Sequence, residues 1–359
     1  SALIQAKALD KKTGDTGNRI YSLGEICISN QAWTTAEKCF DYIVAKGSSH
    51  PLYIRAKIAM LSAAFEKTTE SHYTQAELLT LEKQFTETLQ ELGRNSITAP
   101  LMVKQAQLEA FYLDKVAEGR RILEEVIAMP ALSPNYIAEV KLALGDIMIL
   151  DGDLWEASLT YSQVDKDFKH DAIGREAKFR NARLSYYLGE FEWAAAQLNV
   201  LKQATSQLIS NDALDLALLI SDNIGDDSIT EPLQIYSRAE LHAFQHKNDL
   251  ALKTLDSILV LYPGRKITAN VWFKQAGIYF TKGDFEKAIA LYSDIVKNYA
   301  DGVLADDALF RIGSIYENNL KDTENAKSTY EQFIDKYPSS VFIAEARRHY
   351  RLLRGDKIN

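Results

Sequence analysis

Residues 283–292 read Gly283-Asp284-Phe285-Glu286-Lys287-Ala288-Ile289-Ala290-Leu291-Tyr292. The small Ala288 is followed four positions later by the large Tyr292, and this pattern recurs along the chain. Gly119, Ala157 and Ala194 are spaced by 38 and 37 residues, and Ala251, Ala288 and Ala326 by 37 and 38. Ala36 occupies a comparable place nearer the start. A constant step of this size is typical of a helical solenoid, in which each helix pair packs only against its neighbours.

Other residues of the unit repeat along with the small one. In residues 269–300, relative positions 4, 11, 15, 20 and 24 are Trp272, Tyr279, Gly283, Ala288 and Tyr292. Further copies supply Leu309, Ile312, Gly313, Tyr316, Ala326, Tyr330 and Pro338; Leu144, Gly145, Gly152, Ala157 and Tyr161; and Leu23, Gly24, Ala36 and Phe40. The pattern resembles the tetratricopeptide repeat, which consists of two antiparallel helices.

This resemblance implies an all-α fold, a right-handed superhelical solenoid of roughly eight antiparallel helix pairs. Small residues at positions 8 and 20 allow the paired helices to approach closely, and the larger residues fill the space around that contact. We therefore expect Ala288 and Ala326 to be buried where paired helices cross.

The step breaks between Ala194 and Ala251, which are 57 residues apart. The surplus contains an apolar helix at 211–220 without an evident partner and an acidic, turn-rich segment at 223–231 before Pro232. We predict an array at 1–205, an irregular helix and acidic linker at 206–231, and a second array at 232–359 ending in a capping helix at 342–353. One continuous array with a single irregular repeat remains the alternative.

Composition and charge exclude several classes of function. The hydrophobic content is 47%, with seven prolines and seventeen glycines, which favours an ordered chain. A net charge of −8 argues against nucleic acid as a partner. Residues 2–9 form an expected helix without a partner, so we expect an amino-terminal segment with a targeting signal to precede Ser1. Membrane association is expected only through that segment.

Cys27 and Cys39 lie on the two helices of one expected hairpin. The register places Cys39 near Gly24 rather than Cys27, so the geometry that a disulfide demands is not expected. Two buried thiols that pack as small apolar side chains are the favoured interpretation.

Few residues suggest chemistry. His242 and His246 are four apart and would share a helix face, which is a spacing found at metal sites, but no third ligand accompanies them. The acidic residues of 222–231 lack the alternation of a calcium loop. Because phosphate-binding, hydrolase and dinucleotide motifs are missing as well, we predict a protein that is not an enzyme and has no catalytic residue, metal or cofactor.

The first helix of each unit in this fold lines a concave face, and aromatic side chains there are typical interface anchors. Four of the candidate residues share one face of an expected helix, because they stand at i, i+4, i+7 and i+8: Phe179, Arg183, Tyr186 and Tyr187. About half of all the candidate residues are expected to lie in the core rather than on the concave face. The predicted partner-binding residues are Phe111, Tyr112, Phe179, Arg183, Tyr186, Tyr187, Phe244, Phe273 and Phe280.

Chaperone-binding members of the family hold a chain terminus with a lysine at position 5 and an asparagine at position 9. Here Lys104 at position 5 is followed by Leu108 at position 9, so that clamp is absent. An apolar or extended segment of a protein partner is therefore the expected ligand.

The turn between units is three residues longer than in the consensus, and its Tyr337-Pro338-Ser339-Ser340 form is similar to that of tetratricopeptide proteins of the bacterial cell envelope. The resemblance implies a non-catalytic scaffold of an envelope complex, periplasmic or associated with the outer membrane. A cytoplasmic regulatory adaptor is the first alternative. A ligand-binding or enzymatic module around His242 and His246 is the second.

Overall fold

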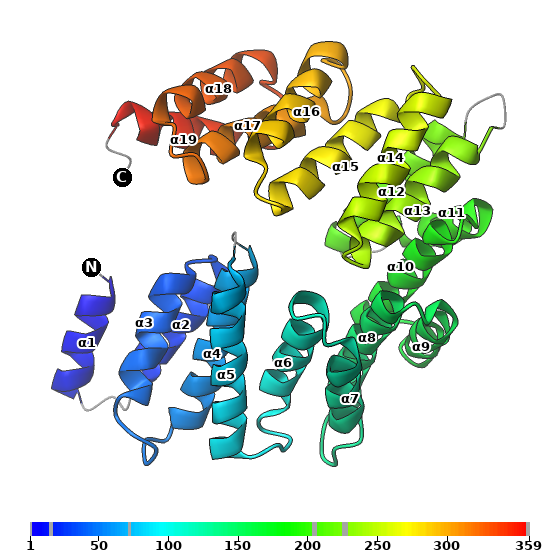
Figure 1. Ribbon diagram of the computed structural model, residues 1–359. Coiled ribbons are helices and arrows are strands. Elements are labelled where there is room, and N and C mark those ends of the chain that lie inside the picture. Colours follow the sequence, from blue (N-terminus) through cyan, green and yellow to red (C-terminus); the bar gives the residue numbers. More distant parts are fainter. Residues whose placement is uncertain (1, 14–16, 71–72, 203–206, 225–228, 357–359) are drawn as a thin grey trace. The chain divides into compact units, whose positions relative to one another are not determined.

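The computed structural model describes residues 2–13, 17–70, 73–202, 207–224 and 229–356. These residues form nineteen α-helices and no β-strand, which confirms the predicted all-α solenoid class (Figure 1). Consecutive helices pack against each other from α1 to α9 and from α11 to α19, as the repeat pattern requires.

The chain divides into two compact units, residues 1–181 and 182–359, and the division falls inside α10. The first unit contains α1 (Ala2–Thr13), α2 (Asn18–Ser29), α3 (Trp33–Val44), α4 (Tyr53–Glu70), α5 (Gln75–Leu92), α6 (Ala99–Tyr112), α7 (Val116–Ile127), α8 (Pro134–Asp151), α9 (Leu154–Asp167) and the start of α10 (Ala172–Tyr187).

The second unit contains the end of α10 and nine further helices: α11 (Phe191–Leu201), α12 (Gln207–Asn223), α13 (Glu231–Phe244), α14 (Asn248–Leu261), α15 (Thr268–Thr281), α16 (Phe285–Asn298), α17 (Ala305–Asn318), α18 (Thr323–Lys336) and α19 (Ile343–Arg354). The apolar helix expected at 211–220 is α12, and it packs against α11. The predicted array boundaries at 205 and 232 describe repeats rather than compact bodies, and they stay predictions.

The small residues of the repeat lie where paired helices meet. Ala288 and Ala326 are both 0% exposed, as predicted. At Gly145, an added Cβ would lie 2.4 Å from the ring of Tyr161, and at Gly313 it would lie 2.9 Å from the ring of Tyr330. These positions therefore admit only a hydrogen in place of a side chain, because an aromatic ring of the second helix rests on the backbone of the first.

The amino-terminal helix has partners in the first unit. Asp10 of α1 is buried and accepts hydrogen bonds from the hydroxyl of Tyr42 at 3.0 Å, the ammonium of Lys46 at 2.6 Å and the amide of Gly17 at 2.9 Å. Burial alone would raise the pKa of this carboxyl, but the three hydrogen bonds outweigh it and hold the pKa below 3.8. The helix expected to lack a partner is thus tied to α3.

Protonation of Asp10 should loosen α1. Because the folded-state pKa is lowered, the stabilisation is present at neutral pH and is lost as the pH falls below about 4. Asp10→Asn should abolish that pH dependence and raise amide exchange in residues 2–13 already at pH 7, by about tenfold. Hydrogen exchange followed by mass spectrometry measures both effects, and unchanged protection in the variant would contradict the role given to Asp10.

Cys27 and Cys39 are free thiols buried in the apolar core of the first unit. The predicted register is wrong, because Gly24 faces the ring of Phe40, and Cys39 contacts Cys27. Burial raises the pKa of Cys39 to about 11. Both side chains pack beside Ala36 and Phe40, so they act as small apolar groups.

Candidate partner-binding surface

A polar network joins three helices of the second unit. The carboxylate of Glu240 on α13 accepts a hydrogen bond from the hydroxyl of Tyr186 on α10 at 2.8 Å and one from the ammonium of Lys274 on α15 at 3.0 Å. Burial raises the pKa of Tyr186 well above 10, and the neighbouring carboxylate raises it further. Burial opposes the charge on Lys274, but Glu240 outweighs it and raises the pKa of Lys274.

Half-buried side chains surround this network. The guanidinium carbon of Arg183 lies 5.7 Å from the ring centre of Phe244. The rings of Tyr187 and Phe244 are 6.2 Å apart, and those of Tyr186 and Tyr187 are 5.8 Å apart. Arg183, Tyr187, Phe244 and Lys274 together form what we call the Arg–aromatic surface.

The next helices carry further aromatic groups. Phe273 on α15 is half-buried, packs against Tyr292 at 5.3 Å and lies under the guanidinium of Arg311 at 5.1 Å. Phe280 at the end of α15 is 38% exposed. An added Cβ at Gly277, between these two phenylalanines in the sequence, would meet no atom within 4 Å. The middle of α15 therefore has open space beside it.

The structure divides the predicted binding residues. In the second unit, Arg183, Tyr187, Phe244 and Phe273 are half-buried and Phe280 is exposed, so all five can reach a partner. Tyr186 is 0% exposed. The structure thus moves Tyr186 from the predicted contact surface into the core beneath it, because its hydroxyl has to reach the carboxylate of Glu240.

The other three predicted residues belong to the first unit. Phe111 and Tyr112 at the end of α6 are half-buried, and the ring of Tyr112 contacts those of Phe65 at 6.0 Å and Tyr73 at 5.5 Å. Phe179 is only 9% exposed. Phe111 and Tyr112 stay candidate contacts, whereas Phe179 lies mostly in the core.

The same polar network occurs elsewhere, which the sequence reasoning missed. Asp146 accepts hydrogen bonds from the hydroxyl of Tyr161 at 2.7 Å and the guanidinium of Arg180. Glu317 accepts one from the hydroxyl of Tyr330 at 3.0 Å, and the Nδ1 atom of His349 lies 2.7 Å from the carboxylate of Glu317. We call the sets around Glu240 and Asp146, in which the third group is a lysine or an arginine, carboxylate–tyrosine–cation triads. A carboxylate followed 34 residues later by a cation is the signal that reveals the first two.

The histidine pair does not have the predicted arrangement on one helix face. His242 lies in the last turn of α13, but the helix ends at Phe244, and His246 lies in the following turn with a φ of 58°. The two side chains therefore do not share a helix face, contrary to the prediction. Burial and the nearby cations Lys247 and Arg238 lower the pKa of His242. Across the described residues, no cluster of three or more metal-ligating side chains is present.

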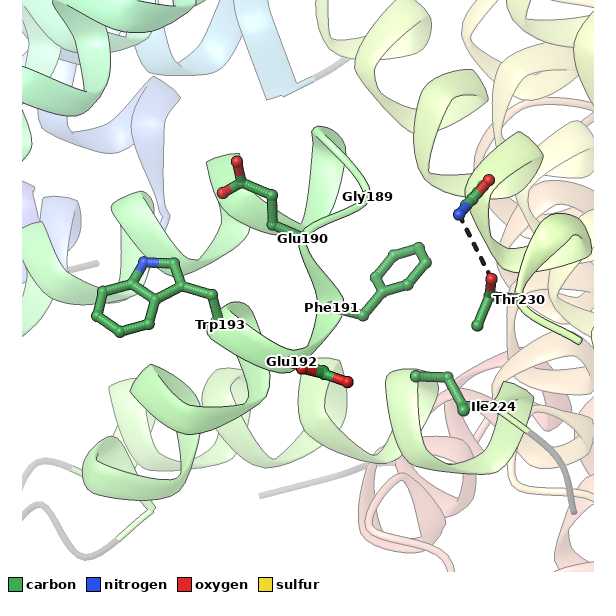
Figure 2. A pocket seen from close by; sticks show the side chains of 8 residues that line it. Gly189, Glu190, Phe191, Glu192, Trp193, Ile224 and Thr230 are labelled. Atoms are coloured by element: carbon green, nitrogen blue, oxygen red, sulfur yellow. Dashed lines mark hydrogen bonds between the residues drawn. The ribbon is translucent and has the colours of Figure 1, made fainter. Parts of the chain in front are cut away.

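An open pocket lies directly after the carboxyl end of α10. It has a volume of ≈ 960 Å³ and is formed by the turn from Gly189 to Trp193, by Ile224 after α12, and by Thr230 and Gln234 at the start of α13. Figure 2 shows the ring of Phe191 directed toward Thr230, with Glu190 and Trp193 on the other side of that ring. The indole of Trp193 is 60% exposed.

The helix pairs and their glycine–tyrosine contacts define a repeat protein of the interaction class. The family model described as tetratricopeptide repeat matches residues 270–302 and 307–340. The match confirms the predicted tetratricopeptide resemblance in these two segments. No curated protein matches the chain.

Several solved structures are similar to this chain at low identity. A tetratricopeptide repeat protein from Parabacteroides merdae is 14% identical over 88% of this chain and 99% of its own, with a TM-score of 0.41. The apo form of RapI is 10% identical over 94% and 97%, with a TM-score of 0.43. A Rap protein complexed with Competence and Sporulation Factor is 13% identical over 96% and 97%, with a TM-score of 0.41. The superpositions are too loose to say anything about partners.

None of the helices in the described part of the chain is both long and apolar enough to cross a bilayer.

Proposed function

We propose that the protein is a non-catalytic scaffold that binds a protein partner through the Arg–aromatic surface of its second unit. Tetratricopeptide repeats support the general class. The observation that carries the finer proposal is the arrangement of Arg183, Tyr187 and Phe244 over a hydrogen-bonded core. Arginine and aromatic side chains held in place by packing are the usual anchors of protein interfaces.

The polar network beneath this surface restricts the movement of the rings of Tyr187 and Phe244. Tyr186 and Glu240 are held by each other and by Lys274, so Tyr187 and Phe244 rest on a fixed base. A fixed base reduces the entropy that the rings lose when a partner covers them. An extended or apolar segment fits such a surface, as the sequence predicted.

The double variant Tyr187→Ala/Phe244→Ala should weaken partner binding by at least roughly tenfold, because each truncated anchor removes about 1–2 kcal/mol of contact. The partner is first identified by crosslinking and affinity capture from detergent-solubilised membranes and, separately, from the cytosol. The affinity of the purified pair is then measured by titration calorimetry.

Phe111→Ala in the first unit is the matched control, since it removes a half-buried aromatic ring outside the proposed surface. Equal affinities of the double variant and the wild type, with both folded by circular dichroism, would exclude the surface. A larger loss in Phe111→Ala than in the double variant would transfer the binding site to the first unit.

We further propose that the partner belongs to the bacterial envelope, on the strength of the long Tyr-Pro turn between repeats at 337–340. Fractionation of cells producing the natural full-length protein, combined with protease accessibility from the periplasmic side, tests this location. Recovery in the cytosol with full protection would favour the alternative, a cytoplasmic regulatory adaptor.

A further inference from the structure

Two turns of the second unit have nearly the same sequence and backbone. Gly189-Glu190-Phe191-Glu192-Trp193 begins α11, and Gly283-Asp284-Phe285-Glu286-Lys287 begins α16. The glycines have φ angles of 81° and 78°. The amide after each glycine donates to a carbonyl five residues earlier, from Glu190 to Ser185 and from Asp284 to Tyr279, both at 2.9 Å. Each turn also lines a pocket.

The two turns differ in how the acid after the glycine is neutralised. The carboxylate of Asp284 accepts a hydrogen bond from the ammonium of Lys287, three residues on, at 2.6 Å. The same ammonium lies 5.1 Å from the ring centre of Tyr279. A third turn of this kind, at Gly152, has the carboxylate of Asp153 paired with Arg120 at 2.6 Å. In two of the three turns, the protein itself supplies a cation to the acid.

The turn at Gly189 has no such cation. Trp193 stands in the place of Lys287, and within the described part of the chain neither Glu190 nor Glu192 pairs with a lysine or arginine. The pocket beside them is lined by the apolar side chains of Phe191 and Ile224, and none of its described lining residues is cationic. An indole is the aromatic group that binds cations best.

We propose that this pocket binds a lysine or arginine side chain of a partner protein, with the cation between Glu190 and Trp193 and the aliphatic stem beside Phe191. The partner's cation then pairs with Glu190 as Lys287 pairs with Asp284 in the turn at Gly283. Charge complementarity supports this occupant, since the pocket is acidic and the chain carries a net charge of −8 that attracts basic segments. The pocket is a second contact site, separate from the Arg–aromatic surface, and it extends the proposed scaffold function by naming a chemical class of partner.

Trp193→Lys is the most direct test, because it introduces the residue that the turn at Gly283 has at this place. The new lysine can then pair with Glu190, as Lys287 pairs with Asp284. The probe is the peptide acetyl-Ala-Lys-Ala-Lys-Ala-amide, titrated into the ¹⁵N-labelled full chain while the indole and backbone signals are followed by NMR. We expect the signals of residues 189–193 to shift, and the affinity to fall roughly fivefold in Trp193→Lys and about twofold in Glu190→Gln.

Trp155→Lys is the matched control, since its indole is 79% exposed at the start of α9 in the first unit. It should bind the peptide as the wild type does. A second control replaces both lysines of the peptide by norleucine, which keeps the stem and removes the charge, and this peptide should bind at least roughly fivefold more weakly.

No saturable binding to wild type, equal affinity in Trp193→Lys, or equal affinity for the norleucine peptide would each overturn the proposal. The double variant Tyr187→Ala/Phe244→Ala separates this site from the Arg–aromatic surface. It should bind the lysine peptide with unchanged affinity. The pocket at Trp193 and the Arg–aromatic surface are therefore tested independently of each other.

Discussion

Glu240→Leu is expected to lower the free energy of unfolding of the second unit by about 2–3 kcal/mol, the cost of leaving a buried polar group without its partner. The substitution removes the acceptor of two groups, the buried hydroxyl of Tyr186 and the ammonium of Lys274. Most of the cost falls on Tyr186, because its ring is 0% exposed and the hydroxyl has no route to solvent. Lys274 has 32% of its side chain exposed and can rehydrate in part. Urea unfolding followed by circular dichroism measures the loss.

Glu240→Gln is the control, since its amide oxygen still accepts a hydrogen bond from Tyr186 and only the charge is lost. We expect it to cost less than half as much as Glu240→Leu. Equal stability of Glu240→Leu and wild type would show that the triad contributes nothing to the packing of α10, α13 and α15.

Ala288→Leu should destabilise the second unit by about 1–3 kcal/mol through overpacking. Ala288 is 0% exposed and belongs to the same core cluster as Ala276, Tyr292 and Ile312. Three added carbon atoms have to push α15 and α16 apart, since cores of this density have no room for them. Differential scanning calorimetry should show a lowered transition temperature.

The matched control is Ala290→Leu, two positions further along α16, where the side chain is exposed. It should leave the transition within about 0.5 kcal/mol of wild type. A transition temperature unchanged in Ala288→Leu, or lowered as much in Ala290→Leu, would contradict the assignment of Ala288 to the helix crossing.

The repeat was readable from the sequence because its contacts are local. Ala288 and Tyr292, or Gly145 and Tyr161, belong to one hairpin, so their spacing is set by helix geometry alone. A ring that needs a glycine opposite it leaves a pair of residues at a fixed separation, and copies of that pair reveal the period. The burial of Ala288 and Ala326 followed directly.

The binding residues were harder to predict because exposure depends on the neighbouring repeat. Tyr186 and Tyr187 are adjacent in sequence, and only the position of Glu240 on α13 decides which ring turns inward. His246 lies beyond the end of α13, and helix ends are the least reliable part of a pattern-based prediction. The pocket at Trp193 could not be predicted from its own sequence. Its distinguishing feature appears only when Trp193 is compared with Lys287, which occupies the same place in the turn at Gly283.

The carboxylate–tyrosine–cation triads have a consequence for how each unit unfolds. Each acid is shared among three helices, so Asp146 connects α8, α9 and α10, and Glu240 connects α10, α13 and α15. If one of these helices detaches, the acid loses a partner and the other two are weakened with it. In a linear array, a boundary between folded and unfolded repeats then costs more free energy, because the contacts of a shared acid are lost there. The intrinsic stability of each single repeat becomes less important by comparison. Partly frayed states then become rare, and the helices joined by a triad melt as a block.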